Sequence, residues 1–183
     1  MPITNTRQCT TGLAVAGLMV STALVFGYAP IVVAAEELPR EAVLPLSLAS
    51  TATSAALDRC AKDGHRVSVA VVDRAGVLRV LMRGDGAGPH TVESSMKKAY
   101  TSASLRGSTG DLAEMIAKMP ATQGLRDMGD KVLILAGGLP IEISGEVVGG
   151  IGVGGAPGGH LDAACAQAGL DSIGAKPKFS PAK

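Results

Sequence analysis

Apolar side chains at helical spacing mark the first element of the chain. In residues 46–63, small apolar side chains recur every three or four positions, at Ala49, Ala52, Ala56 and Cys60. This spacing places them on one face of a helix. Gly64 favours the end of that helix, because glycine readily adopts the conformation that closes a helix.

A β-branched run follows in residues 65–73, and three of its valines share one face: Val67, Val69 and Val71. Residues 74–76 (Arg-Ala-Gly) form a turn, and residues 77–83 form a second apolar run. Two such runs joined by a short turn predict an antiparallel hairpin.

Two helical stripes occupy the middle of the chain. After the glycine-rich loop 84–89, Thr91 is expected to cap a helix with the apolar face Val92, Met96, Ala99, Tyr100 and Ala103. Residues 107–110 interrupt the pattern. The next stripe has i, i+3, i+4, i+7 spacing at Leu112, Met115, Ile116 and Met119. Pro120 ends it.

The last third of the chain predicts more strands and a closing helix. Residues 131–138 form an apolar run, and residues 139–143 and 147–153 form a hairpin around a turn at 144–146. The closing helix carries the stripe Leu161, Ala164, Cys165 and Ala168. Paired hairpins with intervening helices predict an α+β fold, in which helices cover a mostly antiparallel sheet.

The segment 146–164 contains seven glycines, and Gly150, Gly152 and Gly155 spell G-x-G-x-x-G. A dinucleotide site also needs a further parallel strand with an acidic residue about 20 positions on. The sequence provides no such strand after Leu170, so nucleotide binding is disfavoured. We instead expect these glycines to let another backbone or a flat ligand approach closely. A turn should follow, feeding a helix whose N–H groups either bind an anion or serve the turn alone.

The first 35 residues read as a secretory signal peptide. A long uncharged apolar run follows Arg7, and small residues precede Glu36, so cleavage is expected after Ala35. An uncleaved membrane anchor is the alternative, because the apolar run is long enough to span a bilayer. Cleavage leaves 148 residues with balanced charge and no basic patch, which argues against nucleic-acid binding.

Two cysteines, Cys60 and Cys165, remain after cleavage. An oxidising compartment would let them pair, and the alternative, which the pattern favours, is two buried thiols that pack as small apolar side chains. Only Tyr100 and Phe179 remain as aromatic residues. The polar tail 174–183 is expected to be disordered.

Three stretches resemble one known family: 67–88, 97–104 and 137–173. Together they are similar to the GlcG/HbpS family of haem-binding proteins and to the C-terminal domain of PduO-type corrinoid proteins. The likeness runs from about Leu46 to Ile173, so we expect one domain over residues 36–173. The resemblance implies a profilin-like α/β sandwich, homo-oligomers and, in several members, bound haem or corrinoid.

Haem requires an apolar slot, an axial ligand, and cations or N–H groups for its two propionates. His90, after the flexible loop, is the candidate iron ligand, and a solvent-exposed position at the helix start is the alternative. His160 is a weaker candidate at the last helix start, while His65 is expected to face water. Lys98 or Arg83 would pair with a propionate. Tyr100 would ligate iron or bond a carboxylate, or else serve as the aromatic anchor of the core.

The leading hypothesis is therefore an exported, periplasmic or extracellular protein that binds haem or a related tetrapyrrole for haem capture, iron handling or redox sensing. One alternative is an enzyme that degrades haem or turns over a small metabolite in the same cleft, although the sequence shows no catalytic constellation. Another is a cofactor-free oligomeric accessory of a membrane sensor or receptor.

Overall fold

Four strands form one antiparallel sheet in the computed structural model, which describes residues 37–176. The strand order is β2-β1-β4-β3, with these bounds: β1 Ser68–Asp73, β2 Leu78–Arg83, β3 Gly138–Ile143 and β4 Glu146–Gly154. Both predicted hairpins are present, as β1–β2 and β3–β4. The expected α+β fold with an antiparallel sheet is confirmed. The predicted signal peptide lies outside the described residues.

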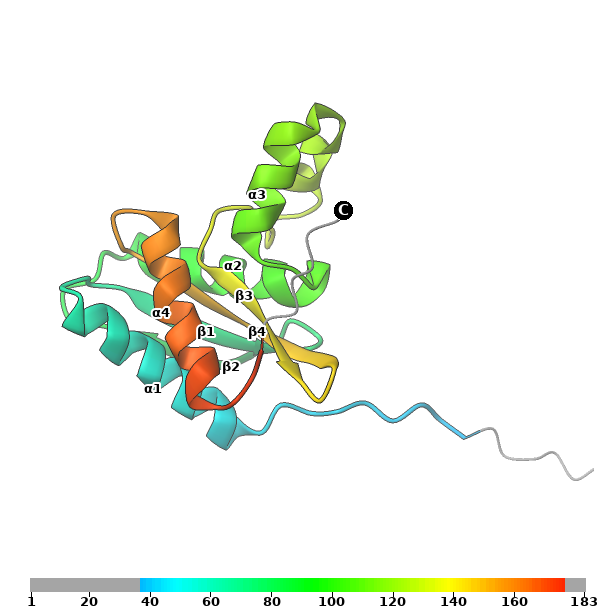
Figure 1. Ribbon diagram of the computed structural model, residues 1–183, viewed down its shortest axis with the longest axis horizontal. Helices are drawn as coiled ribbons and strands as arrows, with labels where there is room; N and C mark the ends of the chain where they lie inside the picture. The colour runs from blue at the N-terminus through cyan, green and yellow to red at the C-terminus, as the bar shows by residue number, and fades with distance from the viewer. Residues whose placement is uncertain (1–36, 177–183) are drawn as a thin grey trace, which may run out of the picture. The chain divides into compact units, whose positions relative to one another are not determined.

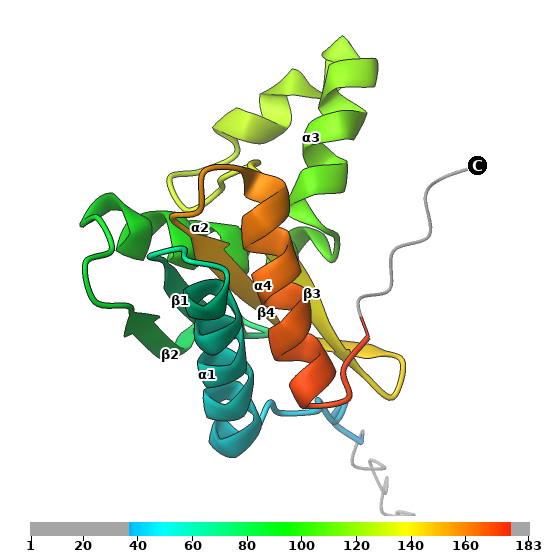
Figure 2. The same ribbon diagram turned by 60° about the vertical axis from the view of Figure 1, so that its left-hand side comes forward.

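Helices cover both faces of this sheet. On one face α1 (Leu46–Lys62) and α4 (Gly159–Ser172) lie side by side, and on the other lies α2 (His90–Leu105) (Figures 1 and 2). The helix α3 (Thr109–Lys118) and the 3-10 helix η1 (Pro120–Asp127) project beyond the sheet (Figure 1). Within the described residues, no helix is long and apolar enough to cross a membrane.

The two faces of β1 belong to different hydrophobic clusters. Alternate strand residues point to opposite faces. Val67, Val69 and Val71 accordingly pack with α1 and α4, whereas Ala70 and Val72 pack with α2. The predicted stripe of α1 is fully buried, as Ala49, Ala52, Ala56 and Cys60. β1 is therefore a central strand buried on both faces.

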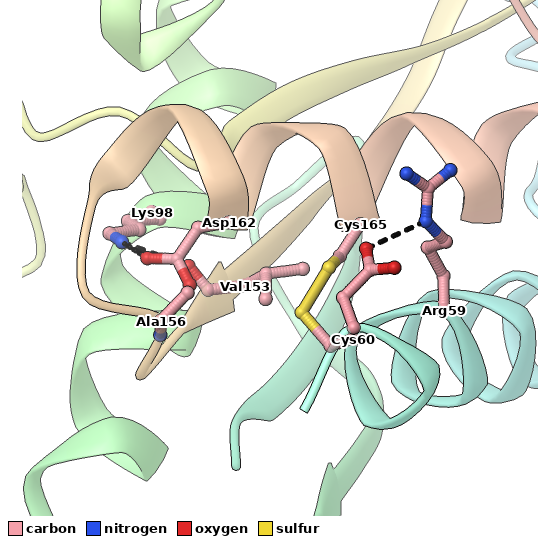
Figure 3. The surroundings of a disulfide bond; sticks show 8 residues. Arg59, Cys60, Lys98, Val153, Ala156, Asp162 and Cys165 are labelled. Atoms are coloured by element: carbon pink, nitrogen blue, oxygen red, sulfur yellow. Dashed lines mark hydrogen bonds and ion pairs between the residues drawn. A yellow bond between two sulfur atoms is a disulfide. The ribbon is translucent and has the colours of Figure 1, made fainter. Parts of the chain in front are cut away.

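A disulfide joins Cys60 of α1 to Cys165 of α4, with 5.5 Å between the Cα atoms (Figure 3). The sequence left this pairing open. Both cysteines lie in the cluster between the two helices and the sheet. The bond thus links the first helix of the domain to the last.

The glycines of β4 let helix α2 lie directly on the strand. A Cβ atom on Gly150 would collide with the carbonyl oxygen of Ala99, and one on Gly152 would collide with that of Ser95. The expectation of a close backbone approach is confirmed, and the approaching backbone is a helix. β4 pairs antiparallel with both of its neighbours, so the glycine motif lies outside a dinucleotide-binding βαβ unit.

Three local expectations were wrong. Residues 131–137 form no strand, because Thr101 of α2 accepts the backbone N–H of Leu133 at 2.8 Å and the chain reaches the sheet only at Gly138. Thr91 does not cap α2: Pro89 is the N-cap, and the Thr91 hydroxyl donates to the carbonyl of Gly88.

The third wrong expectation concerns the buried face of α4. Ala164 is exposed, and the buried residues are Asp162, Cys165, Ala166, Gly169 and Leu170. The buried face differs from the predicted one because Asp162 is buried. An apolar pattern assigns a carboxylate to the surface, but this one forms an ion pair with the buried Lys98.

Candidate functional site

A cleft of about 560 Å³ opens where the β1–β2 hairpin, α2 and the loop before β3 meet. We call it the hairpin cleft. Its apolar wall consists of Val72, Ala75, Val77, Leu78 and Met96, and its remaining lining residues are Gly76, Glu93, Lys97, Tyr100, Asp130 and Lys131. A volume of this size lies within the range of roughly 300–1,000 Å³ typical of small-molecule sites.

The hairpin turn forms one wall of the cleft and is fixed by its own hydrogen bonds. Asp73 Oδ1 accepts the backbone N–H groups of Ala75 and Val77, both at 3.0 Å. Gly76 has a φ of +75°, which glycine adopts without strain. A Cβ at this position would lie 2.6 Å from ring carbons of Tyr100, so the glycine also allows the phenol ring to rest against the turn.

Charged side chains surround the apolar wall. Lys97 forms an ion pair with Glu93 one turn earlier on α2, at 2.9 Å. The ammonium of Lys131 lies over the Tyr100 ring, 5.5 Å from its centroid. This contact places a cation against the ring's negative face. The cleft therefore combines an apolar body with a phenol and two lysines.

Tyr100 is the one predicted site residue that lines the cleft. It is half-buried and belongs to neither hydrophobic cluster of the described residues. The alternative interpretation of Tyr100 as the aromatic anchor of the core is therefore wrong. Tyr100 instead forms part of the lining of the cleft.

The structure places Lys98 away from the cleft, at the opposite side of α2. The residue is 1% exposed, and its ammonium donates to Asp162 at 2.7 Å and to the carbonyl of Val153 at 2.9 Å (Figure 3). Asp162 also accepts the N–H of Ala156 at 3.0 Å. Lys98 thus ties α2 to β4 and to the start of α4, and its charge is already matched.

The histidines and Arg83 also lie apart from the lining of the cleft. His90 is exposed at the first position of α2, and His160 is exposed in the first turn of α4. Arg83 is exposed and donates from Nε to the carbonyl of Ala87 at 2.9 Å. His65, half-buried, lines a separate groove with Arg66 and Asp85.

Sequence reasoning missed Lys131 and Glu93 as cleft residues. Glu93 carried a usable signal, since it lies one helical turn before Lys97 and two before Tyr100. Lys131 carried none, because the residues around it were assigned to a strand. Among the described residues no group of three or more His, Cys, Asp or Glu side chains could hold a bare metal ion.

A family model described as "Haem degrading protein HbpS-like" matches residues 44–171. The chain belongs to the HbpS-like family. A variant of HbpS from Streptomyces reticuli with two Glu-to-Asp substitutions is 43% identical, with a TM-score of 0.71 over 79% of this chain and 97% of that one. The PduOC:heme complex is 26% identical, with a TM-score of 0.69 over 75% of this chain and all of that one.

Relatives in the HbpS-like family include Protein GlcG of Escherichia coli K12. It is 32% identical over 113 residues, which cover 61% of this chain and 81% of GlcG. A 15.0 kDa protein from the dhaT-dhaS intergenic region of Citrobacter freundii is 32% identical over 90 residues. That match spans 49% of this chain and 63% of the Citrobacter protein. The resemblance inferred from residues 67–88, 97–104 and 137–173 is confirmed.

Proposed function

We propose that this protein binds haem or a related tetrapyrrole in the hairpin cleft. The observation that carries the proposal is the cleft itself, which sets an apolar wall beside the Tyr100 phenol with Lys97 and Lys131 at its margin. This arrangement suits a flat apolar ring that bears carboxylates. Membership of the HbpS-like family and the similarity to PduOC, whose structure is a haem complex, support the same ligand class.

The donor set of the cleft fits an iron porphyrin. Tyr100 offers a phenol oxygen and Met96 a thioether sulfur, and both groups ligate haem iron in known proteins. Bound haem would supply redox and oxygen chemistry; the chain supplies the slot and the ligand. We favour Tyr100 over His90 as the iron ligand, because His90 is not among the residues that line the cleft.

Titration with hemin tests both parts of the proposal. The chain beginning at Glu36 should shift the hemin Soret band at micromolar protein. Tyr100→Phe keeps the ring but removes the donor oxygen, so it should move the band position, while His90→Ala should leave affinity and spectrum unchanged. If the band moves only in His90→Ala, His90 is the ligand and the Tyr100 assignment fails. If the parent protein produces no shift, haem binding fails altogether.

We also propose that the protein is exported and cleaved after Ala35. The Cys60–Cys165 disulfide supports export, because such bonds persist mainly in oxidising compartments. Protein purified from its host should have the intact mass of a chain that begins at Glu36, less the two hydrogen atoms lost when the disulfide forms. Recovery of residues 1–35 in a membrane fraction would contradict cleavage.

A second candidate function is oxidative breakdown of haem, favoured by the description of the matched family as haem degrading. In the presence of a reductant and oxygen, it predicts loss of the Soret band together with release of iron. A stable Soret band under those conditions would leave binding as the function. A corrinoid is the alternative ligand, and competition between hemin and cobalamin separates the two.

A further inference from the structure

Arg79 occupies an irregular position in β2, next to the hairpin cleft. Val71 pairs with Val80, but Val72 pairs with Leu78, so Arg79 is the extra residue of a β-bulge. A bulge of this kind changes the direction of a side chain and commonly borders a functional site. Leu78, the preceding residue, lines the cleft, whereas Arg79 borders the lining without being part of it.

The bulge interrupts the alternation of faces along β2. Leu78 pairs with Val72, which packs in the cluster under α2, whereas Val80 pairs with Val71 and packs against the cluster under α1 and α4. Arg79 lies between these two residues, directly after Leu78 of the cleft lining.

The Nε atom of the Arg79 guanidinium donates no hydrogen bond within the described residues. This atom is buried, and it is the one buried side-chain nitrogen or oxygen without a hydrogen-bond partner in the described part of the chain. Buried polar groups in proteins nearly always have a partner, so a specific exception calls for an explanation. No ion pair of Arg79 occurs within residues 37–176 either.

The two lysines of the cleft differ in whether they form an ion pair. Lys97 already has Glu93 as its partner, at 2.9 Å. Lys131 has the face of the Tyr100 ring but no ion pair with a described carboxylate. Within the described residues, neither Lys131, which lines the cleft, nor Arg79, which follows Leu78 of the lining, forms an ion pair.

We propose that Arg79 binds a carboxylate of the cleft ligand, and that Lys131 binds a second one. The ligand class is then an apolar ring with two acidic side chains. Arg79 forms the stronger contact, because a guanidinium binds a carboxylate with two parallel N–H bonds. This inference rests on the proposed function and specifies the polar half of the same site.

Tyrosine fluorescence provides a direct readout of the cleft. The sequence contains two tyrosines, Tyr28 and Tyr100, and no tryptophan. Protein that begins at Glu36 therefore has Tyr100 as its sole strong ultraviolet fluorophore. Metal-free protoporphyrin IX serves as the probe, so the measurement does not depend on iron ligation.

The experiment compares protoporphyrin IX with its dimethyl ester on three proteins: the parent, Arg79→Gln, and the matched control Arg83→Gln from the same strand. The parent should bind the diacid about tenfold or more tightly than the ester, as expected for loss of charge-assisted hydrogen bonds. Arg79→Gln should lose most of that preference, and Arg83→Gln should retain it. The ratio of diacid to ester affinity also corrects for general damage to the fold.

Two outcomes overturn the inference in different ways. If the parent binds both probes and Arg79→Gln keeps the full preference for the diacid, the assignment of Arg79 is wrong while tetrapyrrole binding stands. If neither hemin nor either porphyrin quenches Tyr100, both the inference and the proposed function fail.

Discussion

The two faces of the sheet are built on different principles. Between the sheet and the α1–α4 pair lie branched aliphatic side chains and a disulfide. Between the sheet and α2 lie glycines, alanines and serines, and the backbones are in contact. The first face stabilises the fold by burying apolar area. On the second face, the backbone of α2 lies directly on the sheet, and larger side chains such as Met96 and Tyr100 line the hairpin cleft.

Hydrogen bonds from buried hydroxyl groups add to the packing on the α2 face, where apolar side chains are few. Ser102 donates to the carbonyls of Ala99 and Leu139, and Thr101 donates to the carbonyl of Lys97. These hydroxyls are buried and satisfied, so they cost little. The comparison teaches that one sheet can combine a sealed core with a recognition face, and the predictions below test that division.

The largest effect is expected from removing the disulfide on the sealed face. The paired change Cys60→Ala and Cys165→Ala opens a loop with a sequence separation of 105 residues. The chain-entropy model assigns about 4–5 kcal/mol to a loop of this length. Urea unfolding of the variant and of the oxidised parent measures the difference. A loss below about 1 kcal/mol would contradict the prediction.

Breaking the buried ion pair should cost about 3–5 kcal/mol, because Lys98→Met leaves the Asp162 carboxylate buried without its cation. Adding Asp162→Leu removes that charge and should recover much of the loss. A double-mutant cycle from urea unfolding provides the measurement. Simple additivity of the two changes would show that the pair is not the source of the loss.

Gly152→Ala tests the backbone contact between α2 and β4. The new methyl meets the backbone of Ser95 and Ala99, neither of which can yield without moving the helix. Overpacking of this kind costs about 1–3 kcal/mol or more. Gly129→Ala is the matched control: no atom lies within 4 Å of the added methyl, so its melting temperature should match that of the parent. Equal melting temperatures for both variants would refute the close contact.

The smallest effect is expected at Met96 in the hairpin cleft. Met96→Leu conserves volume and should cost less than about 1.5 kcal/mol. Since we assign iron ligation to Tyr100, the Soret band of the hemin complex should keep its position in this variant. A displaced band would identify the Met96 thioether as an iron ligand.

Local periodicity was sufficient for much of the fold. The stripe of α1 and both hairpins depend on neighbours a few residues away, so their patterns are legible in the sequence. The predicted stripe of α3 was right in part: Ile116 is buried, but Met119 is 47% exposed and follows the last residue of the helix. The Lys98–Asp162 pair joins residues 64 positions apart, and each looks like a surface residue in its own helix. Leu133 likewise lies in an apolar run that predicts a strand. In the structure its backbone N–H donates to the hydroxyl of Thr101 and is not paired in the sheet.

The candidate site was less accessible to sequence reasoning than the fold. Tyr100 was identified because it stands in a family-like stretch, but the cleft is assembled from a hairpin turn, a helix face and a loop. Arg79 owes its position to a bulge, which no periodic pattern reveals. His90 was selected for its imidazole and its place after the flexible loop, but it is not among the residues that line the cleft. The hemin titration of His90→Ala tests its role as an iron ligand.

The bond between Cys60 and Cys165 also changes what a protease can do to this protein. It encloses the sheet, α2, α3 and η1 in one covalent ring. A single cut in the projecting α3–η1 region opens that ring without releasing either piece. The nicked chain therefore migrates as one band on a non-reducing gel and as two after reduction. Such a ring keeps Asp130 and Lys131, which follow the cut, in the same molecule as the cleft residues that precede it.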